Sequence, residues 1–126
     1  MACRITELAV DCTDPEALAA FWCAVLDYRV LGRDHDGVEI GREGEYPTLV
    51  FAAVPEPKTQ KLRLHVDVNA TDRDQDAELE RLLALGARPV DVGQGDVDWH
   101  VLQDPEGNEF CLLRARVEPS APPPDR

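Results

Sequence analysis

A four-residue pattern that occurs twice constrains the fold of this chain more than any other feature. Leu-Ala-Val-Asp ends an apolar stretch at residues 8–11, and Leu-His-Val-Asp does the same at residues 64–67. Each copy is followed by one amphipathic helical pattern and then by several short strand-like segments. A period of nearly half the chain indicates two copies of one supersecondary unit, because solenoids need three or more short repeats. Two such units can pair their sheets around a central groove, where we expect the functional residues.

The first copy combines an alternating strand with a well-marked helix. Residues 4–11 put Glu7 and Asp11 on one strand face, with apolar side chains on the other. Asp14-Pro15-Glu16 is typical of a helix start, because Asp caps the first turn and Pro suits its first position. Apolar residues then recur with helical spacing and form one buried stripe: Leu18, Phe21, Trp22, Val25 and Leu26. Strands are predicted at residues 28–31, 37–40 and 48–54, before a Pro-Glu-Pro hinge at 55–57.

The second copy opens with the most regular alternation in the chain. One strand face at residues 61–68 carries Lys61, Arg63, His65 and Asp67. A helix capped by Thr71 or Asp72 follows and ends at Gly86. Strands are predicted at 88–92, 97–102 and 109–114. Each copy is therefore β-α-β-β-β, with module one at 1–54 and module two at 60–116 of a single domain, 1–116, and a disordered Pro-rich tail at 117–126.

Charge and cysteine usage exclude several classes of partner. The chain has 25 acidic and 13 basic residues, a net charge of -12, which argues against nucleic acid and anionic membrane surfaces. No apolar run reaches the length of a membrane span, and the N-terminus has no signal-peptide core. The four cysteines (Cys3, Cys12, Cys23 and Cys111) have no metal-type spacing, so we expect reduced thiols in a cytoplasmic protein.

Two segments resemble the vicinal-oxygen-chelate superfamily. Residues 14–22, with Val-Leu-Asp-Tyr at 25–28, look like its first helix, and Asp-Pro-Glu-Gly-Asn-Glu-Phe at 104–110 looks like the turn into its last strand. Arg-x-His-x-Asp at 63–67, and Trp99 ahead of that turn, are similar to its glyoxalase-like domains. The resemblance implies an α+β fold, in which two βαβββ modules form an eight-stranded cup-shaped mixed sheet with helices on the outer face. It also implies a homodimer.

The resemblance raises the question of a metal cofactor. In metal-using members, a divalent ion in the cup chelates two adjacent substrate oxygens and stabilises the anion that forms. Counting along the family motifs puts the ligand positions at Lys61, at Cys111, and at Ile5 or Glu7. An ammonium group cannot ligate a cation, and too few hard ligands remain for magnesium, manganese or iron. We therefore expect no metal cofactor. Displaced sets stay open, either Glu7 and His65 with Glu109, or a zinc-type set of Glu7, His65 and Cys111.

Without a metal, the polar strand face of the second copy is the candidate site. Arg63, beside Lys61, is suited to hold a carboxylate or phenolate ligand, opposite Glu7 and Asp11 of the other module. His65 is the candidate general acid or base, with Glu7 as its catalytic partner. The alternative for Arg63 is an internal ion pair with Asp67 or Glu7, and the alternative for His65 is a structural histidine with its hydrogen bonds satisfied.

Trp99 and Cys111 complete the candidate ligand-binding residues. Trp99 is either core or an aromatic wall suited to flat organic ligands. Cys111 is either part of the site or a small buried apolar residue.

Three functions remain open. The preferred one is a glyoxalase-like protein that binds a small organic molecule in the cup between its modules, without a catalytic metal. The second is an enzyme, a lyase, isomerase or dioxygenase, with displaced metal ligands or with acid-base chemistry on His65 and Glu7. The third is an accessory subunit whose own side chains fill its cup. The fold alone does not choose among them.

Overall fold

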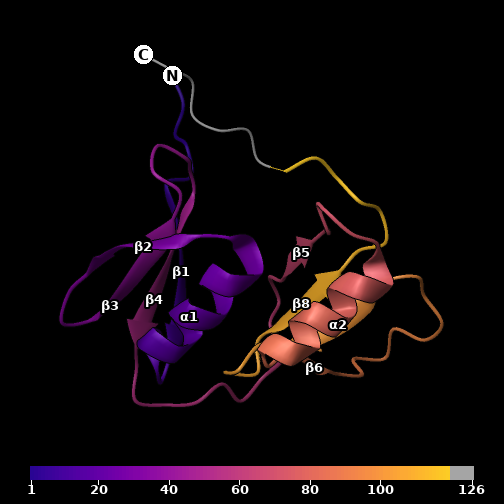
Figure 1. Ribbon diagram of the computed structural model, residues 1–126. Helices are drawn as coiled ribbons and strands as arrows, with labels where there is room; N and C mark the ends of the chain where they lie inside the picture. Colours follow the sequence, from indigo (N-terminus) through magenta and orange to yellow (C-terminus); the bar gives the residue numbers. More distant parts are fainter. Residues whose placement is uncertain (120–126) are drawn as a thin grey trace. The chain divides into compact units, whose positions relative to one another are not determined.

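The computed structural model describes residues 1–119, which form two compact units, one from Met1 to Pro57 and one beginning at Lys58 (Figure 1). Each unit holds one helix and one four-stranded sheet. The last seven residues of the predicted Pro-rich tail, 120–126, lie outside the described residues. In its first part, the backbone N–H of Val117 donates a hydrogen bond to the Ala70 carbonyl at 3.0 Å.

The first unit is a β-α-β-β-β module, as the repeat predicts. Its elements are β1 (Glu7–Cys12), α1 (Pro15–Leu26), β2 (Arg29–Arg33), β3 (Gly37–Gly41) and β4 (Thr48–Ala53). The strand order is β1-β4-β3-β2. β1 runs parallel to β4, and the other neighbours are antiparallel.

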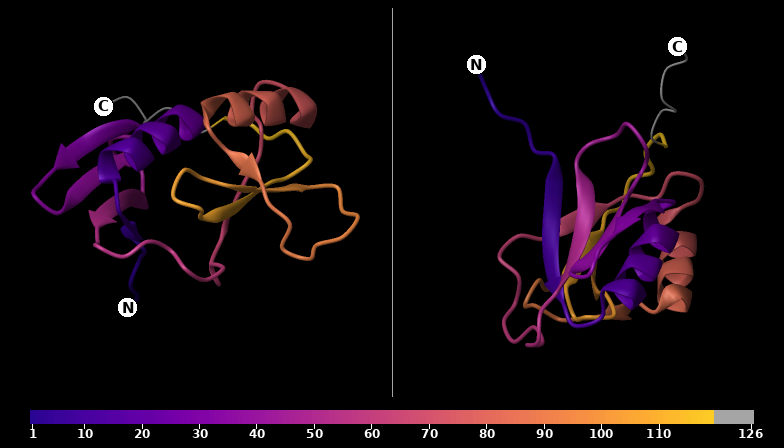
Figure 2. Two further views of the ribbon diagram at one scale, coloured as in Figure 1. Left: turned by 90° about the horizontal axis from the view of Figure 1, so that it is seen from below. Right: turned by 90° about the vertical axis from the view of Figure 1, so that its left-hand side faces the viewer.

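Helix α1 forms where the sequence predicts it and lies over one face of this sheet (Figure 2). The buried residues of its apolar stripe are Leu18, Phe21, Trp22 and Val25. The Asp14 side chain accepts a hydrogen bond from the Ala17 N–H, which caps the helix, and Pro15 takes the first position. The side chains of Leu18, Ile40 and Phe51 are at most 1% exposed. Because side chains alternate along a strand, Glu7 and Asp11 lie on the other face of β1, where both are exposed.

The second unit repeats this topology with shorter strands. Its elements are β5 (Val66–Val68), α2 (Gln75–Leu85), β6 (Arg88–Pro89), β7 (His100–Gln103) and β8 (Glu109–Leu112). The order is β5-β8-β7-β6, with β5 parallel to β8 and the other pairs antiparallel. Leu82, Leu102, Phe110 and Leu112 are at most 1% exposed and form its core.

The start of α2 differs from the sequence prediction, whereas its end does not. Asp74 is the N-cap, and its side chain accepts from the Ala77 N–H at 2.8 Å. Thr71 and Asp72, the predicted caps, precede the helix by several residues, and Asp72 pairs with Arg73 instead. Gly86 ends the helix in the left-handed conformation, with φ of 116°, as predicted.

The predicted strand at residues 61–68 is mostly not a strand. Only Val66–Val68 pairs with β8, and the chain from Lys58 to His65 takes an irregular path. One cause is the Glu109 carboxylate, which accepts the Leu62 backbone N–H at 2.9 Å and so removes a donor that a strand ladder needs. The expectation of four polar side chains on one regular strand face is therefore wrong for Lys61, Arg63 and His65.

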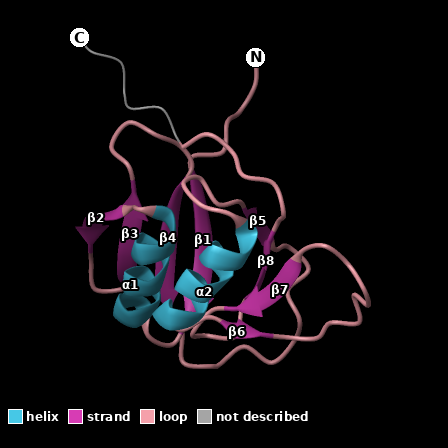
Figure 3. Cartoon of the chain, turned by 45° about the vertical axis from the view of Figure 1, so that its right-hand side comes forward, coloured by secondary structure: helices cyan, strands magenta, loops and turns pink. Residues whose placement is uncertain are grey.

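The strands around residues 91–98 are also shorter than predicted, because a loop replaces their ends (Figure 3). β6 covers only Arg88–Pro89, and β7 begins at His100. Gly93 and Gly95 have φ of 87° and 69°, which a strand cannot accommodate. Among the described residues, no helix is long and apolar enough to cross a bilayer.

Candidate functional site

Three chemically active side chains of the second unit lie together, namely those of His65, Asp67 and Cys111. Asp67 on β5 and Cys111 on β8 are cross-strand partners. His65 precedes β5, and its Nε2 atom lies 3.5 Å from Oδ1 of Asp67. One potential ligand atom from each of the three residues lies within 4.8 Å of the others. We call these residues the His65–Asp67–Cys111 cluster.

The electrostatics of the cluster keep Cys111 in its thiol form. Burial raises the pKa of the Cys111 thiol, and the Asp67 carboxylate raises it further through its charge and a hydrogen bond, against a smaller lowering effect of Lys61. The thiol is therefore protonated at neutral pH. Because the thiolate is the reactive form of cysteine, Cys111 is a poor nucleophile here.

The donor atoms of the cluster fit some metal ions better than others. Imidazole nitrogen, carboxylate oxygen and thiolate sulfur are the ligands that zinc takes, and three protein ligands are typical of a catalytic zinc site. Binding would remove the thiol proton. Magnesium and manganese prefer oxygen-rich octahedral surroundings, which a cysteine does not supply. The residues therefore fit a zinc-type ion and do not fit a hard ion.

Glu109, named in one of the displaced ligand sets, is engaged elsewhere. Its carboxylate accepts from Lys58 Nζ at 2.8 Å and from the Leu62 N–H at 2.9 Å. Burial acts to raise the pKa of Glu109, but the hydrogen bonds from Leu62 and Lys58 outweigh it and lower the pKa. This ion pair favours Cys111 over Glu109 as a member of any metal site.

The two predicted anion-binding residues, Lys61 and Arg63, share no hydrogen-bond or ion-pair partner within residues 1–119. The Lys61 ammonium donates to the Leu62 carbonyl at 3.1 Å. Arg63 is exposed, and within residues 1–119 it forms no ion pair with Asp67, which lies beside His65 instead. The Arg63–Asp67 pair, one of the two ion pairs in the alternative for Arg63, is therefore absent from the described part of the chain.

In the first unit, Glu7 and Asp11 occupy the sheet face away from α1. Glu7 pairs in register with Thr48, whose hydroxyl donates to Glu39 at 2.7 Å. Glu39 is thus a third carboxylate on this face, which strand alternation alone did not single out. That Glu7 and Asp11 meet a ligand together with His65 and Arg63 stays a prediction.

A second group of three candidate ligands lies in the turn between β2 and β3. Asp34, His35 and Asp36 are all exposed. The Asp34 carboxylate accepts the backbone N–H groups of Asp36 and Gly37, which lower its pKa. These bonds are those of an ordinary side-chain-stabilised turn. His35 is a turn residue, as its sequence context indicates.

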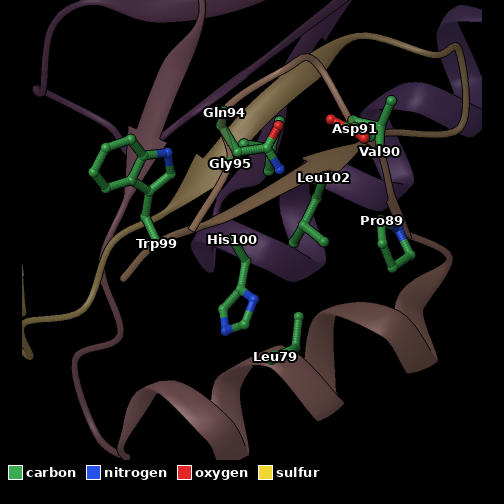
Figure 4. Close-up of a pocket in the computed structure, with 10 residues that line it drawn as sticks. Leu79, Pro89, Val90, Asp91, Gln94, Gly95, Trp99, His100 and Leu102 are labelled. Atoms are coloured by element: carbon green, nitrogen blue, oxygen red, sulfur yellow. The ribbon is translucent and has the colours of Figure 1, made fainter. Parts of the chain in front are cut away.

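The second unit also has a pocket of about 450 Å³ beside β7 (Figure 4). It is bounded by Leu79 of α2, Pro89 of β6, strand β7 and the loop at residues 91–95. Its lining residues are Leu79, Pro89, Val90, Asp91, Gln94, Gly95, Trp99, His100, Val101 and Leu102. Trp99, a predicted ligand-binding residue, is among them and is 38% exposed.

His100 lines the pocket although the sequence did not single it out. Alternation predicts that adjacent Trp99 and His100 point to opposite sides, and Figure 4 shows the imidazole directed towards Leu79 and the indole away from it. The available signal was the Asp- and Gly-rich segment just before Trp99. That composition indicates a surface loop at this position, and such loops often carry binding residues.

The loop that borders the pocket is held by its own side chains. Oδ1 of Asp91 accepts the Gly93 N–H at 2.8 Å, and Oε1 of Gln94 accepts the Val92 N–H at 2.9 Å. At its far end, the Gln75 amide donates to the carbonyls of Asp98, at 2.9 Å, and Leu112, at 3.3 Å. These bonds fix the backbone just before Trp99.

This chain is similar to a known protein family and to several solved structures. Residues 7–113 match the family model described as a glyoxalase-like domain. No curated protein matches the sequence. The fosfomycin resistance protein FosX from Mesorhizobium loti matches at a TM-score of 0.68 and 15% identity, over 93% of this chain and 96% of that one. FosX from Listeria monocytogenes matches at 0.69 and 15%, over 93% and 94%.

A glyoxalase/bleomycin resistance protein/dioxygenase family enzyme from Burkholderia phytofirmans PsJN matches at a TM-score of 0.65 and 16% identity, over 85% of this chain and 94% of that one. At such identities these likenesses show the fold alone, and they agree with the two β-α-β-β-β modules and the α+β class. Together with the family match over most of the sequence, they confirm the resemblance. The chain belongs to the glyoxalase-like domain family of the vicinal-oxygen-chelate superfamily.

Proposed function

We propose that this protein binds a small organic molecule in the pocket of its second unit, and that this binding needs no metal ion. The pocket itself carries the proposal. Its volume of about 450 Å³ lies within the range of small-molecule sites. Its lining combines an aromatic wall, apolar side chains and a few polar groups, which is the composition of such sites.

Trp99 is the residue on which binding depends most. Its indole is 38% exposed although it is large and apolar, so a ligand that covers it removes apolar surface from water. Gln94 and His100 supply hydrogen-bonding groups beside it. Such polar groups orient a ligand within an apolar pocket.

A screen by thermal denaturation tests the proposal. A library of small aromatic and heterocyclic compounds is added to chelator-treated protein and, separately, to protein with added Zn²⁺. A ligand at one hundred times its Kd stabilises the folded state by about 2.7 kcal/mol, so hits raise the Tm. We expect hits in the chelated protein. Trp99→Ala is expected to lose them while its far-UV circular dichroism is unchanged.

Tyr46→Ala is the matched control, because Tyr46 is an aromatic residue of the first unit with 57% exposure. It is expected to keep every hit. Hits that survive Trp99→Ala would move the site away from this pocket. The absence of any hit, with or without metal, would overturn the proposal and leave the accessory subunit as the better hypothesis.

A metal-dependent enzyme is the second candidate, favoured by the His65–Asp67–Cys111 cluster. One Listeria monocytogenes FosX structure with this fold is described as a complex with Mn(II) and a dihydroxypropylphosphonic acid. Here His65, Asp67 and Cys111 would hold a zinc-type ion, and such an ion polarises substrate oxygens. Lyase or isomerase activity would follow this route, with His65 as a ligand of the ion and Glu7 as the remaining candidate for acid-base catalysis. Dioxygenase activity would need a redox-active metal, and zinc has no redox chemistry.

Metal analysis of protein purified without chelator separates the two candidates. One zinc ion per chain that is lost in His65→Ala and kept in His35→Ala would favour the enzyme. His35 is the matched control, because it is an exposed histidine flanked by two carboxylates. No bound ion in either variant or in the parent protein would favour metal-free binding.

The homodimer and the cytoplasmic location remain proposals from the family resemblance and from the cysteine usage. Light scattering coupled to size-exclusion chromatography measures the first directly. A mass of twice the 14.0 kDa chain is expected.

A further inference from the structure

We infer that the pocket of the second unit takes an organic cation, an amine or ammonium compound with a flat apolar body, and that the Asp91 carboxylate is its counter-charge. This inference rests on the proposed function, because it names the ligand class of the same pocket. It departs from the anionic ligand that the sequence predicts through Arg63.

The charges of the residues that line the pocket favour a cationic ligand. The ten lining residues include one carboxylate, that of Asp91, and neither lysine nor arginine. An anionic ligand would therefore find no permanent counter-charge in the pocket and would meet a negative one. The net charge of the chain, -12, has the same sign and favours the approach of cations over anions.

Asp91 is available for this role. Its Oδ1 atom accepts the Gly93 N–H, and the side chain forms no ion pair with lysine or arginine in the described part of the chain. Arg88 is the nearest cationic residue in the sequence. Strand β6 consists of Arg88 and Pro89, and successive side chains of a strand point to opposite faces. Arg88 therefore points away from the face on which Pro89 lines the pocket. No lysine or arginine within residues 1–119 therefore pairs with the Asp91 carboxylate, which can pair with a cation from solution.

The shape of the lining sets the rest of the ligand. Figure 4 shows Trp99 and Asp91 on opposite sides of the lining residues, with Leu102 and His100 between them. Leu79, Pro89 and Leu102 add apolar surface. A molecule with an aromatic body and a charged amine at one end matches both features, since aromatic rings pack well against an indole.

Three probes of nearly equal shape test the inference, namely 2-phenylethylammonium, 2-phenylethanol and phenylacetate. They are titrated into ¹⁵N-labelled full-length protein, and the signals of the Trp99 indole and of the loop amides at residues 91–95 are followed by NMR. The ammonium compound is expected to shift these signals and to bind up to about fivefold more tightly than the alcohol, the order of an exposed ion pair. Phenylacetate is expected to bind most weakly.

Asp91→Asn and Asp96→Asn form the matched pair of variants. Both remove one negative charge from an exposed side chain of the same loop, but only Asp91 lines the pocket. Asparagine at position 91 retains an oxygen that accepts the Gly93 N–H, so the loop keeps its turn. Asp91→Asn is expected to lower the affinity for the ammonium probe to that for the alcohol, and Asp96→Asn is expected to leave it within about twofold of the parent, as long-range charge is screened by salt.

The outcomes separate this inference from the function on which it rests. Equal affinity for the ammonium probe and the alcohol, or equal losses in both variants, would overturn the cation and leave a small-molecule pocket in place. No shift of the Trp99 or loop signals with any of the three probes would also overturn the cation, and the compound library would then decide whether the pocket binds a small molecule at all.

Discussion

The ammonium of Lys58 lies 2.8 Å from the Glu109 carboxylate, and only 19% and 11% of these two side chains are exposed. The pair joins the start of the second unit to β8, across 51 residues of sequence. The same carboxylate accepts the Leu62 N–H, so one side chain holds the irregular segment that leads to His65. The position of the His65–Asp67–Cys111 cluster therefore depends on an ion pair outside it.

Glu109→Gln should destabilise the protein by about 2 kcal/mol, because it leaves a largely buried ammonium group without its counter-charge. The free energy of unfolding in urea measures this. Glu80→Gln, which removes an exposed carboxylate on α2, is the control and should change stability by less than about 0.5 kcal/mol. Equal effects of the two substitutions would remove the special role of the Lys58–Glu109 pair.

The contribution of Glu109 should depend on pH in a defined direction. Its pKa is lower in the folded protein than its ordinary value of 4.5, because the bonds from Leu62 and Lys58 outweigh the effect of burial. A carboxyl group of this kind stabilises the folded state fully above its unfolded pKa, and the stabilisation is lost as the pH falls through the lower, folded pKa.

The difference in unfolding free energy between the parent protein and Glu109→Gln should therefore be constant near neutral pH and shrink below about pH 4.5. Urea titrations at a series of pH values measure it. A difference that grows on acidification would contradict the lowered pKa.

The cap of α2 offers a direct comparison between the sequence prediction and the structure. Asp74→Ala removes the side chain that accepts the Ala77 N–H and should cost about 1 kcal/mol of stability. Asp72→Ala removes a predicted cap that instead makes an exposed pair with Arg73, and it should cost less than about 0.5 kcal/mol. Thermal unfolding of both variants measures the difference. A larger loss of stability in Asp72→Ala than in Asp74→Ala would indicate that Asp72 caps the helix, as the sequence predicts.

Local signals predicted the repeated module well, because they act within a few residues. Asp14 and Pro15 start α1 through contacts inside its own first turn, and Gly86 ends α2 through its own backbone conformation. Strand length failed as a prediction where the deciding contact is distant in sequence. The alternation of polar and apolar residues at 61–65 does not indicate that the Glu109 side chain accepts a hydrogen bond from the Leu62 N–H.

The candidate site was predictable to a similar degree. Trp99 stands out as an aromatic residue near a turn-rich segment, and it lines the pocket. Asp91 and His100 were not found, because the fold of the 91–98 loop decides which side chains face inward. The alternative of an Arg63–Asp67 pair assumed strand spacing at residues 63–67, where the strand begins only at Val66.

Gln75→Ala should loosen the backbone ahead of Trp99, since the Gln75 amide donates to the carbonyls of Asp98 and Leu112. The loss of these hydrogen bonds should cost about 1 kcal/mol of stability. Hydrogen exchange at residues 96–100 should become faster, and ligands of the pocket should bind more weakly. Gln60→Ala, at an exposed glutamine of the same unit, is the control and should change neither quantity. Unchanged exchange in Gln75→Ala would show that the loop holds itself without this anchor.

Asp67→Asn should make Cys111 more reactive towards iodoacetamide. The pKa of Cys111 is raised first by burial and then by the charge and hydrogen bond of Asp67, whereas Lys61 lowers it. Neutralising Asp67 removes the second cause and so increases the thiolate fraction at a given pH, and the thiolate is the form that reacts. Peptide mass spectrometry after timed alkylation resolves Cys111 from exposed Cys3, which should react quickly in every variant.

Asp11→Asn is the control for this experiment, because it removes an exposed carboxylate of the first unit. It should leave the alkylation rate of Cys111 unchanged. The pH at which Cys111 reacts at half its maximal rate should fall in Asp67→Asn and stay high in the parent protein. If this pH fell equally in Asp67→Asn and Asp11→Asn, the raised pKa of Cys111 would come from the net charge of the chain and not from the neighbouring carboxylate. Asp67 would then have no specific effect on the reactivity of Cys111.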